Sequence, residues 1–204
     1  MEHCHSLSRR ERERQELRRA ILDTAREIAS SEGWEAVTIR RISGAIEYGA
    51  PAIYALFENK EAILNELVRD GFQRLLEALR EAEQYEMEPE ARLLALGRAY
   101  WEFAERCPRI YKAMHGLDGV PFGDGYKPDE IYELKGLMAK SLKQIFPEKH
   151  LTPQELDDMV QLMRATLIGL VSVTMANRLE GGRERAQALL ERALKDYLTA
   201  WRVM

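Results

Sequence analysis

The chain has 204 residues, of which 46% are hydrophobic and 31% charged, enough for one large helical domain or a small domain joined to a larger one. The net charge of −4 excludes a protein coated in basic residues, and the longest nearly uncharged run, residues 165–177, is too short to span a bilayer. The first residues do not read as an export leader, and Cys4 and Cys107 form no CxxC pair. We therefore expect a cytoplasmic protein with no membrane partner.

Charge is unevenly distributed along the chain. Residues 1–60 contain ten Lys or Arg and ten Asp or Glu, whereas residues 61–204 contain twenty against twenty-four. Six arginines lie within residues 9–19. By itself this cluster is typical of a solvated helix face, in which glutamates pair with arginines four residues away.

The first sixty residues predict three short helices. Apolar residues at spacings of three and four predict a helix over residues 10–32 that ends at Gly33. Thr38 is a good N-cap for a helix over residues 39–46. A turn over residues 48–51 then leads into a third helix, with Pro51 in its first turn, that runs to about Phe57.

The remaining residues predict six more helices, so the fold class is all-α with about nine helices. We expect these helices from Asn59, from Pro89, from Pro108, over 129–146, over 153–179 and over 183–201. The most specific start signal is the capping box Thr152-Pro153-Gln154-Glu155. Residues 116–128 form a Gly/Pro-rich loop, and no strand alternation or internal repeat is present.

Three capped helices in this order fit a helix-turn-helix, in which the second helix crosses the DNA backbone and the third enters the major groove. Ile53 and Phe57 would then pack inward, while Ala50, Ala52 and Tyr54 point outward. Periodicity alone favours this arrangement no more than an ordinary three-helix core that binds no nucleic acid.

Residues 18–64 closely resemble the amino-terminal domain of the TetR family of transcriptional repressors. The matching positions are Ile21 to Ala25, Gly33, Thr38-Ile39, Ile42, Ile53-Tyr54, Phe57 and Lys60-Glu61. The match has no gaps, and residues of different chemical type agree in register. The resemblance implies a helix-turn-helix DNA-binding domain over residues 1–60 and a larger helical ligand-binding and dimerisation domain over residues 61–204.

The resemblance also implies which residues meet DNA. Thr38 would cap the second helix and meet a phosphate, Tyr54 would reach a phosphate with its phenol, and Lys60 would do so at the start of the fourth helix. Arg40 and Arg41 are further candidates for backbone contacts. The turn and the third helix would contribute the remaining expected contacts, from Tyr48, Gly49, Ala50 and Ala52.

Two positions depart from the family pattern. Glu47 stands where the family usually has glycine, which predicts a different turn or a strained left-handed residue, and Gly49 stands where it usually has serine. The third helix also lacks long polar side chains. We therefore expect operator choice to depend on Tyr48, on methyl contacts to thymine, on DNA shape and on an arginine arm over residues 9–19 that enters the minor groove.

The last two helices predict a homodimer interface. Between Leu162 and Met175 only Arg164 is charged, and a helix that is apolar nearly all round is buried on two sides. A two-fold dimer presents two recognition helices to a pseudo-palindromic operator in double-stranded DNA. The expected interface residues are Leu167, Leu170, Val171, Leu190, Leu194 and Tyr197. A single monomeric core is the alternative.

Aromatic and methionine side chains of the fourth to eighth helices are candidates for an effector pocket, although such residues also build ordinary cores. The expected effector is small and hydrophobic or aromatic. The expected ligand-binding residues are Tyr100, Phe103, Tyr111, Met114, His115, Phe122, Met138 and Met163.

Other functions are less well supported. No catalytic triad, Gly-rich phosphate loop or HExxH motif is present, so we expect no enzyme, no catalytic residues and no cofactor. The segment His3-Cys4-His5 leaves a metal-responsive sensor open, although tail residues without a metal are the simpler interpretation. A helical adaptor that binds only protein is the third alternative. The sequence thus predicts a ligand-responsive repressor.

Overall fold

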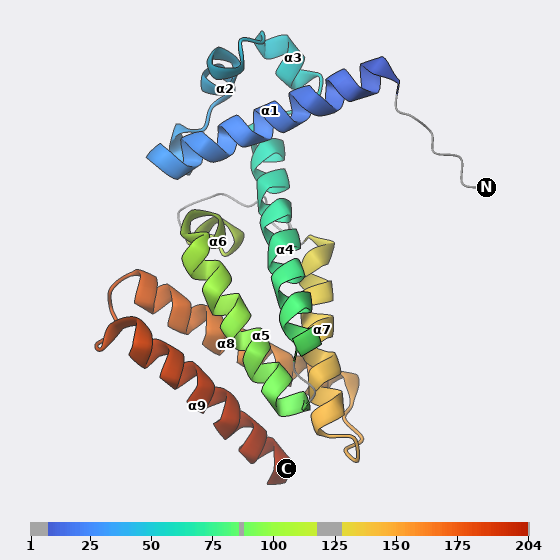
Figure 1. The fold of residues 1–204 in the computed structure, drawn as a ribbon, viewed down its shortest axis with the longest axis vertical. Helices are drawn as coiled ribbons and strands as arrows, with labels where there is room; N and C mark the ends of the chain where they lie inside the picture. Colours follow the sequence, from blue (N-terminus) through green and yellow to red (C-terminus); the bar gives the residue numbers. More distant parts are fainter. Residues whose placement is uncertain (1–7, 86–87, 118–127, 204) are drawn as a thin grey trace, which may run out of the picture. The chain divides into compact units, whose positions relative to one another are not determined.

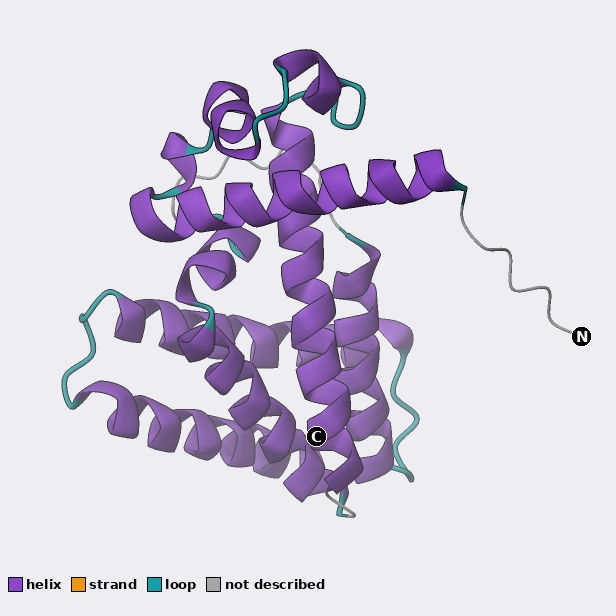
Figure 2. Cartoon of the chain, turned by 45° about the horizontal axis from the view of Figure 1, so that its top comes forward, coloured by secondary structure: helices purple, strands orange, loops and turns teal. Residues whose placement is uncertain are grey.

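The structure is a computed structural model that describes residues 8–85, 88–117 and 128–203. Within these residues it contains nine α-helices, one short 3₁₀ helix and no strand (Figures 1 and 2). The all-α prediction is confirmed. The described residues form two compact units, the first containing residues 8–70 and 112–117, the second the described residues of 71–111 and 128–203.

The first unit contains α1 (Arg9–Glu32), η1 (Trp34–Ala36), α2 (Ile39–Ile46), α3 (Ala50–Tyr54) and the beginning of α4 (Lys60–Tyr85). Helix α1 packs against η1 and α2, and α2 packs against α3. One apolar side of each element builds the core of this unit. Its fully buried residues include Ile21, Ala25, Val37, Ile42, Ile53, Ile63 and Leu67.

Local signals explain the boundaries of these helices. The hydroxyl of Thr38 accepts a hydrogen bond from the Arg41 amide at 3.2 Å, and the side chain of Asn59 accepts one from the Ala62 amide at 2.8 Å. Gly33 ends α1 with φ +93°, a conformation that glycine adopts without strain. The expected end of the third helix at Phe57 is wrong, because the chain leaves the α-helix after Tyr54 and tightens into a turn in which the Leu56 amide bonds the Ile53 carbonyl.

The second unit contains the remainder of α4, α5 (Pro89–Arg106), most of α6 (Pro108–Met114), α7 (Asp129–Ile145), α8 (Pro153–Met175) and α9 (Gly182–Val203). Helix α5 packs against α7, α8 and α9, and α8 packs against both α7 and α9. At the α5–α9 crossing, a Cβ on Gly97 would come within 3.1 Å of Leu194 Cδ1. Glycine at this position therefore permits the close approach of the two helices.

Helix α8 begins at the predicted capping box but ends at Met175, so the expected end at Leu179 is wrong. Asn177 adopts a left-handed conformation with φ +52°, and the amide of Arg178 bonds the carbonyl of Val173 at 2.9 Å. This is the helix-ending arrangement usually associated with glycine, and asparagine also tolerates it. Gly181 instead precedes α9, and Gly182 is its first residue.

Helix α8 also meets a length-and-hydropathy criterion for membrane spans, the one described helix that does so. A core helix of a water-soluble protein meets the same criterion. Six residues of α8 are buried within this chain. The criterion therefore gives only weak evidence for a membrane span.

Candidate nucleic-acid interface

The turn between α2 and α3 carries the backbone strain that the sequence indicates. Glu47 has φ +57° and ψ +27°, the left-handed conformation that a residue with a Cβ adopts at a cost. Beside it, the hydroxyl of Ser43 donates a hydrogen bond to the carbonyl of Tyr48 at 2.6 Å. This bond ties α2 to the main chain two residues before α3. The sequence reasoning did not identify Ser43, although a hydroxyl on α2 close to a helix-turn-helix turn is a usable signal.

Helix α3 presents few polar groups to solvent. Ile53 is fully buried, whereas the side chains of Tyr48 and Tyr54 are 52% and 55% exposed. Gly49 is exposed, and Ala50 and Ala52 are half-buried. Residues 48–54, which we call the recognition element, therefore offer two phenols and several small residues at their surface. Tyr54 is exposed as expected, whereas Ala50 and Ala52, also expected to point outward, are only partly exposed.

The three basic side chains expected to bind phosphates differ in their hydrogen bonds and ion pairs within the protein. Arg40 is exposed and has no ion pair among the described residues. Arg41 makes two hydrogen bonds to the carboxylate of Glu32, the last residue of α1, one of them at 2.8 Å. The Lys60 ammonium donates to the carbonyl of Trp34 at 3.2 Å. Two of the three cations are thus already engaged within the first unit.

The arginine-rich segment is helical from Arg9 rather than an extended arm. Ser8 and Glu11 form a capping box, in which the Ser8 amide donates to the Glu11 carboxylate at 2.8 Å. The Ser8 hydroxyl, and after it this amide, lowers the pKa of Glu11. Arg18 is bound elsewhere, because it pairs with Glu66 and its guanidinium lies 4.5 Å from the centre of the Phe57 ring. It therefore serves packing within this unit.

A surface groove of about 370 Å³ lies beside α3 in the first unit. Arg14 and Leu17 of α1 line one part of it, and Tyr48 and Ala52 line another. The groove thus joins one arginine of the basic segment to the aromatic residue that the sequence singles out for DNA recognition. The basic segment and the recognition element consequently share one surface.

The second unit contains five of the residues expected to bind an effector. Tyr100, Phe103, Tyr111, Met138 and Met163 are all buried there. The rings of Tyr100 and Tyr111 make an edge-to-face contact, with centroids 5.9 Å apart. Met114 and His115 belong to the other compact unit, and Phe122 lies outside the described residues.

The two tyrosines place hydroxyl groups in an apolar interior. Burial raises the pKa of the Tyr111 phenol, and the neighbouring hydroxyls of Tyr100 and Ser172 partly offset the rise. Burial also raises the pKa of Tyr100 well above its ordinary value. Both phenols are therefore neutral over the physiological pH range and act as hydrogen-bonding groups.

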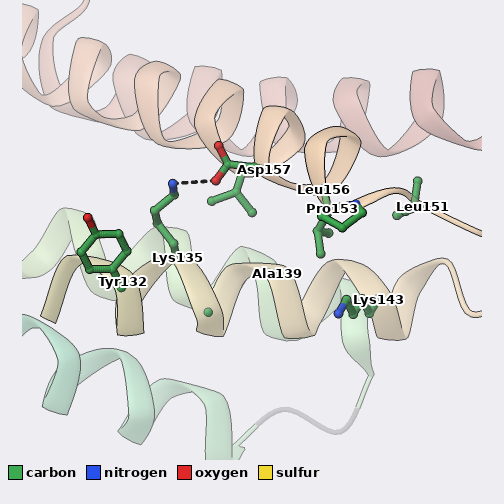
Figure 3. A pocket seen from close by; sticks show the side chains of 10 residues that line it. Tyr132, Lys135, Ala139, Lys143, Leu151, Pro153, Leu156 and Asp157 are labelled. Carbon is green, nitrogen blue, oxygen red and sulfur yellow. Dashed lines mark ion pairs between the residues drawn. The ribbon is translucent and has the colours of Figure 1, made fainter. Parts of the chain in front are cut away.

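The sequence did not indicate a groove of about 320 Å³ between α7 and α8 (Figure 3). Lys135 and Asp157 point toward one another across it, with Nζ 2.6 Å from Oδ1. Leu151, Pro153 and Leu156 form an apolar part of its wall. The hydrogen bond from Lys135 lowers the pKa of Asp157. This pair links α7 to α8 in the second unit.

Four of the residues expected at a dimer interface do not reach the surface. Leu167, Val171, Leu190 and Leu194 are at most 2% exposed within their own chain. Their position is a correction to the expected interface, because α8 and α9 pack against one another and against α5 through these side chains. The other two, Leu170 and Tyr197, are half-buried.

An apolar strip does remain exposed on α8. The side chains of Leu162 and Val173 are 49% and 38% exposed. They lie eleven residues apart, which is close to three helical turns, so both occupy one face of the helix. On the neighbouring helix Tyr197 bonds Thr166 of α8 at 2.7 Å and stacks on Trp201.

No group of three or more potential metal ligands occurs among the residues that the structure describes. The segment His3-Cys4-His5 lies outside those residues. The structure therefore contains no observation that favours the metal-responsive alternative.

Two family models match the chain. One, described as bacterial regulatory proteins of the tetR family, matches residues 21–67, and the other, described as the tetracyclin repressor-like C-terminal domain, matches residues 93–197. A curated relative, the uncharacterised HTH-type transcriptional regulator YobS of Bacillus subtilis (strain 168), is 30% identical over 93 residues, 46% of this chain and 48% of that protein. The chain thus spans about half the length of this relative.

Solved structures agree in fold. A protein of unknown function from Rhodococcus sp. RHA1 is 21% identical with a TM-score of 0.73, and the match covers 98% of both chains. A TetR-family transcriptional regulator from Bordetella parapertussis 12822 is 22% identical with a TM-score of 0.63, over 89% of this chain and 94% of that one. The second family model covers more than half of the chain, and the first covers the helix-turn-helix described above. On these grounds the chain belongs to the tetR family of bacterial regulatory proteins, which are non-enzymatic and bind DNA.

Proposed function

We propose that this regulator is a cytoplasmic repressor that binds a pseudo-palindromic operator as a homodimer and is released by a small hydrophobic or aromatic effector. The observation that carries the proposal is the α2–α3 unit, in which Ile53 is buried while Tyr48 and Tyr54 are exposed. The unit is attached to a larger helical unit whose interior contains hydrogen-bonding phenols. Such a combination suits one surface for DNA and one interior for a small molecule.

The proposed DNA surface comprises the exposed side of α2 and α3. Arg40 and Tyr54 are exposed and suited to phosphate contacts, while Tyr48, Gly49, Ala50 and Ala52 would face the bases. Small side chains allow close approach to the groove but supply no bidentate hydrogen bonds to base edges. Sequence choice then depends on Tyr48 and on the shape of the DNA.

The proposed dimer interface is the apolar strip on α8. It includes Leu162, Leu170 and Val173, with Tyr197 of α9 held beside it by Thr166. Exposed apolar side chains that share one helix face are characteristic of protein interfaces. A second copy with the same strip would bury it in a two-fold arrangement.

The proposed effector site lies in the interior of the second unit, around Tyr100, Tyr111, Met138 and Met163. Methionine side chains adapt to apolar ligands, and the two phenols supply a hydrogen-bonding point for a polar group. An effector that prefers one conformation of the protein shifts the population toward it. Release from DNA follows if that conformation no longer matches the spacing of successive major grooves.

A selection experiment tests the DNA-binding part. The purified protein is incubated with random-sequence duplexes of about 30 base pairs, long enough for two half-sites one helical turn apart. We expect enrichment of an inverted repeat, which binds in a salt-sensitive manner. Recovery of no preferred sequence, with no shift of any duplex, would support the protein-binding adaptor instead.

Native mass spectrometry of the same preparation tests the other two parts. We expect the mass of a dimer, with or without a co-purified small molecule. Titration of candidate hydrophobic and aromatic compounds against the protein–operator complex then identifies those that release DNA. If the protein is a monomer at every concentration at which it binds the operator, the dimer proposal is incorrect.

A further inference from the structure

The pair formed by Glu32 and Arg41 joins the end of α1 to the beginning of α2. Two guanidinium nitrogens of Arg41 bond the two carboxylate oxygens of Glu32, Nη1 to Oε2 at 2.8 Å and Nη2 to Oε1. The side chains remain 42% and 52% exposed, respectively. The pair is therefore accessible to a ligand that approaches from solvent.

The shape of this pair matches the shape of a phosphate contact. A guanidinium presents two parallel N–H groups, which bind the oxygens of a carboxylate or of a phosphate in the same bidentate manner. Glu32 therefore occupies the hydrogen-bonding face of Arg41 that a DNA phosphate would use. The pKa values of both groups shift for the same reason, since their mutual hydrogen bonds lower the pKa of Glu32 and raise that of Arg41.

We propose that Glu32 is a built-in competitor of DNA phosphate for Arg41, and that it sets the affinity and salt dependence of operator binding. This inference rests on the proposed DNA-binding function. In the free protein the carboxylate holds the guanidinium, and in the complex a backbone phosphate replaces it. The exchange costs little, because solvent-exposed ion pairs are weak.

The neighbouring residues leave Arg41 free to move between the two partners. The only other described hydrogen bond of its guanidinium is a long one, 3.5 Å to the carbonyl of Ala36. The adjacent Arg40 has no ion pair among the described residues, so it carries no comparable competitor. Glu32 thus acts on one of the two arginines of α2.

The test compares Glu32→Gln with Glu27→Gln, which removes the same charge from an exposed position of the same helix. Binding is measured by fluorescence anisotropy over a range of salt concentrations, with a labelled random-sequence duplex and with the selected operator. We expect Glu32→Gln to bind DNA about three- to tenfold more tightly at low salt. The substitution removes a negative charge that repels the phosphates, and it leaves the Arg41 guanidinium without its carboxylate partner. The dependence of log K on log salt should steepen by up to about 0.9, because the displaced Glu32 carboxylate of the wild-type complex takes up a cation and the glutamine does not.

A double-mutant cycle with Arg41→Ala separates competition from general repulsion. In the Arg41→Ala background, Glu32→Gln should have no more effect than Glu27→Gln. A purely structural ion pair predicts the opposite sign, since its loss would loosen α2 and weaken binding. Melting temperatures of all variants show whether the fold is retained, and Glu32→Ala provides a second variant.

Three outcomes would overturn the inference. In the first, Glu32→Gln binds no more tightly than Glu27→Gln. In the second, its effect persists undiminished without Arg41. In the third, the wild-type protein binds neither duplex, in which case the proposed DNA-binding function fails as well. The first two outcomes leave that function intact, so the two failures are distinguishable.

Discussion

The hydroxyl of Ser43 donates to the carbonyl of Tyr48 at 2.6 Å, across the turn that contains the left-handed Glu47. The bond joins α2 to the main chain of Tyr48, two residues before α3, and the side chain of this residue is proposed to face a base. A small side chain on one helix therefore orients the residue on which sequence choice is proposed to depend.

Ser43→Ala is expected to lower the free energy of unfolding by about 1 kcal/mol, the net value of one hydrogen bond. It should also reduce the preference for the operator over random DNA, because Tyr48 is then less well oriented. Urea unfolding and anisotropy titrations measure the two effects. Ser30→Ala, at an exposed position of α1, is the control, and equal effects of the two substitutions would contradict the role assigned to Ser43.

Glu47→Gly is expected to raise the free energy of unfolding by about 0.5 kcal/mol. Glycine relieves a left-handed backbone that costs about 1 kcal/mol with a Cβ, and its greater flexibility in the unfolded chain cancels part of the gain. Glu58→Gly removes the same side chain from another exposed position, which has no positive φ, and should destabilise instead. A loss of stability in Glu47→Gly equal to that in Glu58→Gly would show that the turn is unstrained.

Tyr48→Ala is expected to reduce the ratio of operator affinity to random-DNA affinity about tenfold, within the range of one lost base contact. Tyr54→Phe, which removes only a phenol proposed to bind phosphate, should instead weaken binding to both duplexes by a similar factor. Competition titrations with the two duplexes measure the ratio. Unchanged discrimination in Tyr48→Ala would show that operator choice depends on other residues.

Leu170→Glu is expected to convert the dimer to a monomer while retaining helical circular dichroism. Leu170 is half-buried within its own chain and is proposed to face a partner, whereas Leu167 is 1% exposed and lies within the core. Leu167→Ala should therefore lower the free energy of unfolding by about 2–5 kcal/mol. Light scattering after size exclusion gives the mass of each variant. A dimeric Leu170→Glu protein would place the interface on another surface.

Asp157→Asn is expected to destabilise the second unit near neutral pH and to have a diminishing effect in acid. The hydrogen bond from Lys135 lowers the pKa of Asp157 below its ordinary value of 3.8. A lowered pKa in the folded protein contributes stability above the unfolded value, and this contribution is lost as the pH falls through the folded value. Urea unfolding at a series of pH values should show that the free energies of unfolding of the wild-type and Asp157→Asn proteins converge below pH 3.8. A difference that is independent of pH would mean that the charge of Asp157 contributes nothing.

The sequence by itself determined the helices and most of their boundaries. Helical spacing, the N-caps Thr38 and Asn59 and the capping box at Thr152 are local signals, and each acts within one turn of the chain. At Glu47, where the family usually has glycine, the sequence left a different turn or a strained left-handed residue open, and the structure has the left-handed residue. The resemblance of residues 18–64 identified the family from the same local chemistry.

Only the tertiary structure decided which helix faces are buried and which ion pairs the charged side chains form. Periodicity showed that α8 is apolar nearly all round, but the packing of α5, α7 and α9 determines that Leu167 is buried while Leu162 remains exposed. Likewise Arg41 looks like a free phosphate ligand in the sequence, and it pairs with Glu32 because the corner between α1 and α2 brings residues nine positions apart together. Such contacts depend on the path of the backbone between elements, which local propensity does not specify.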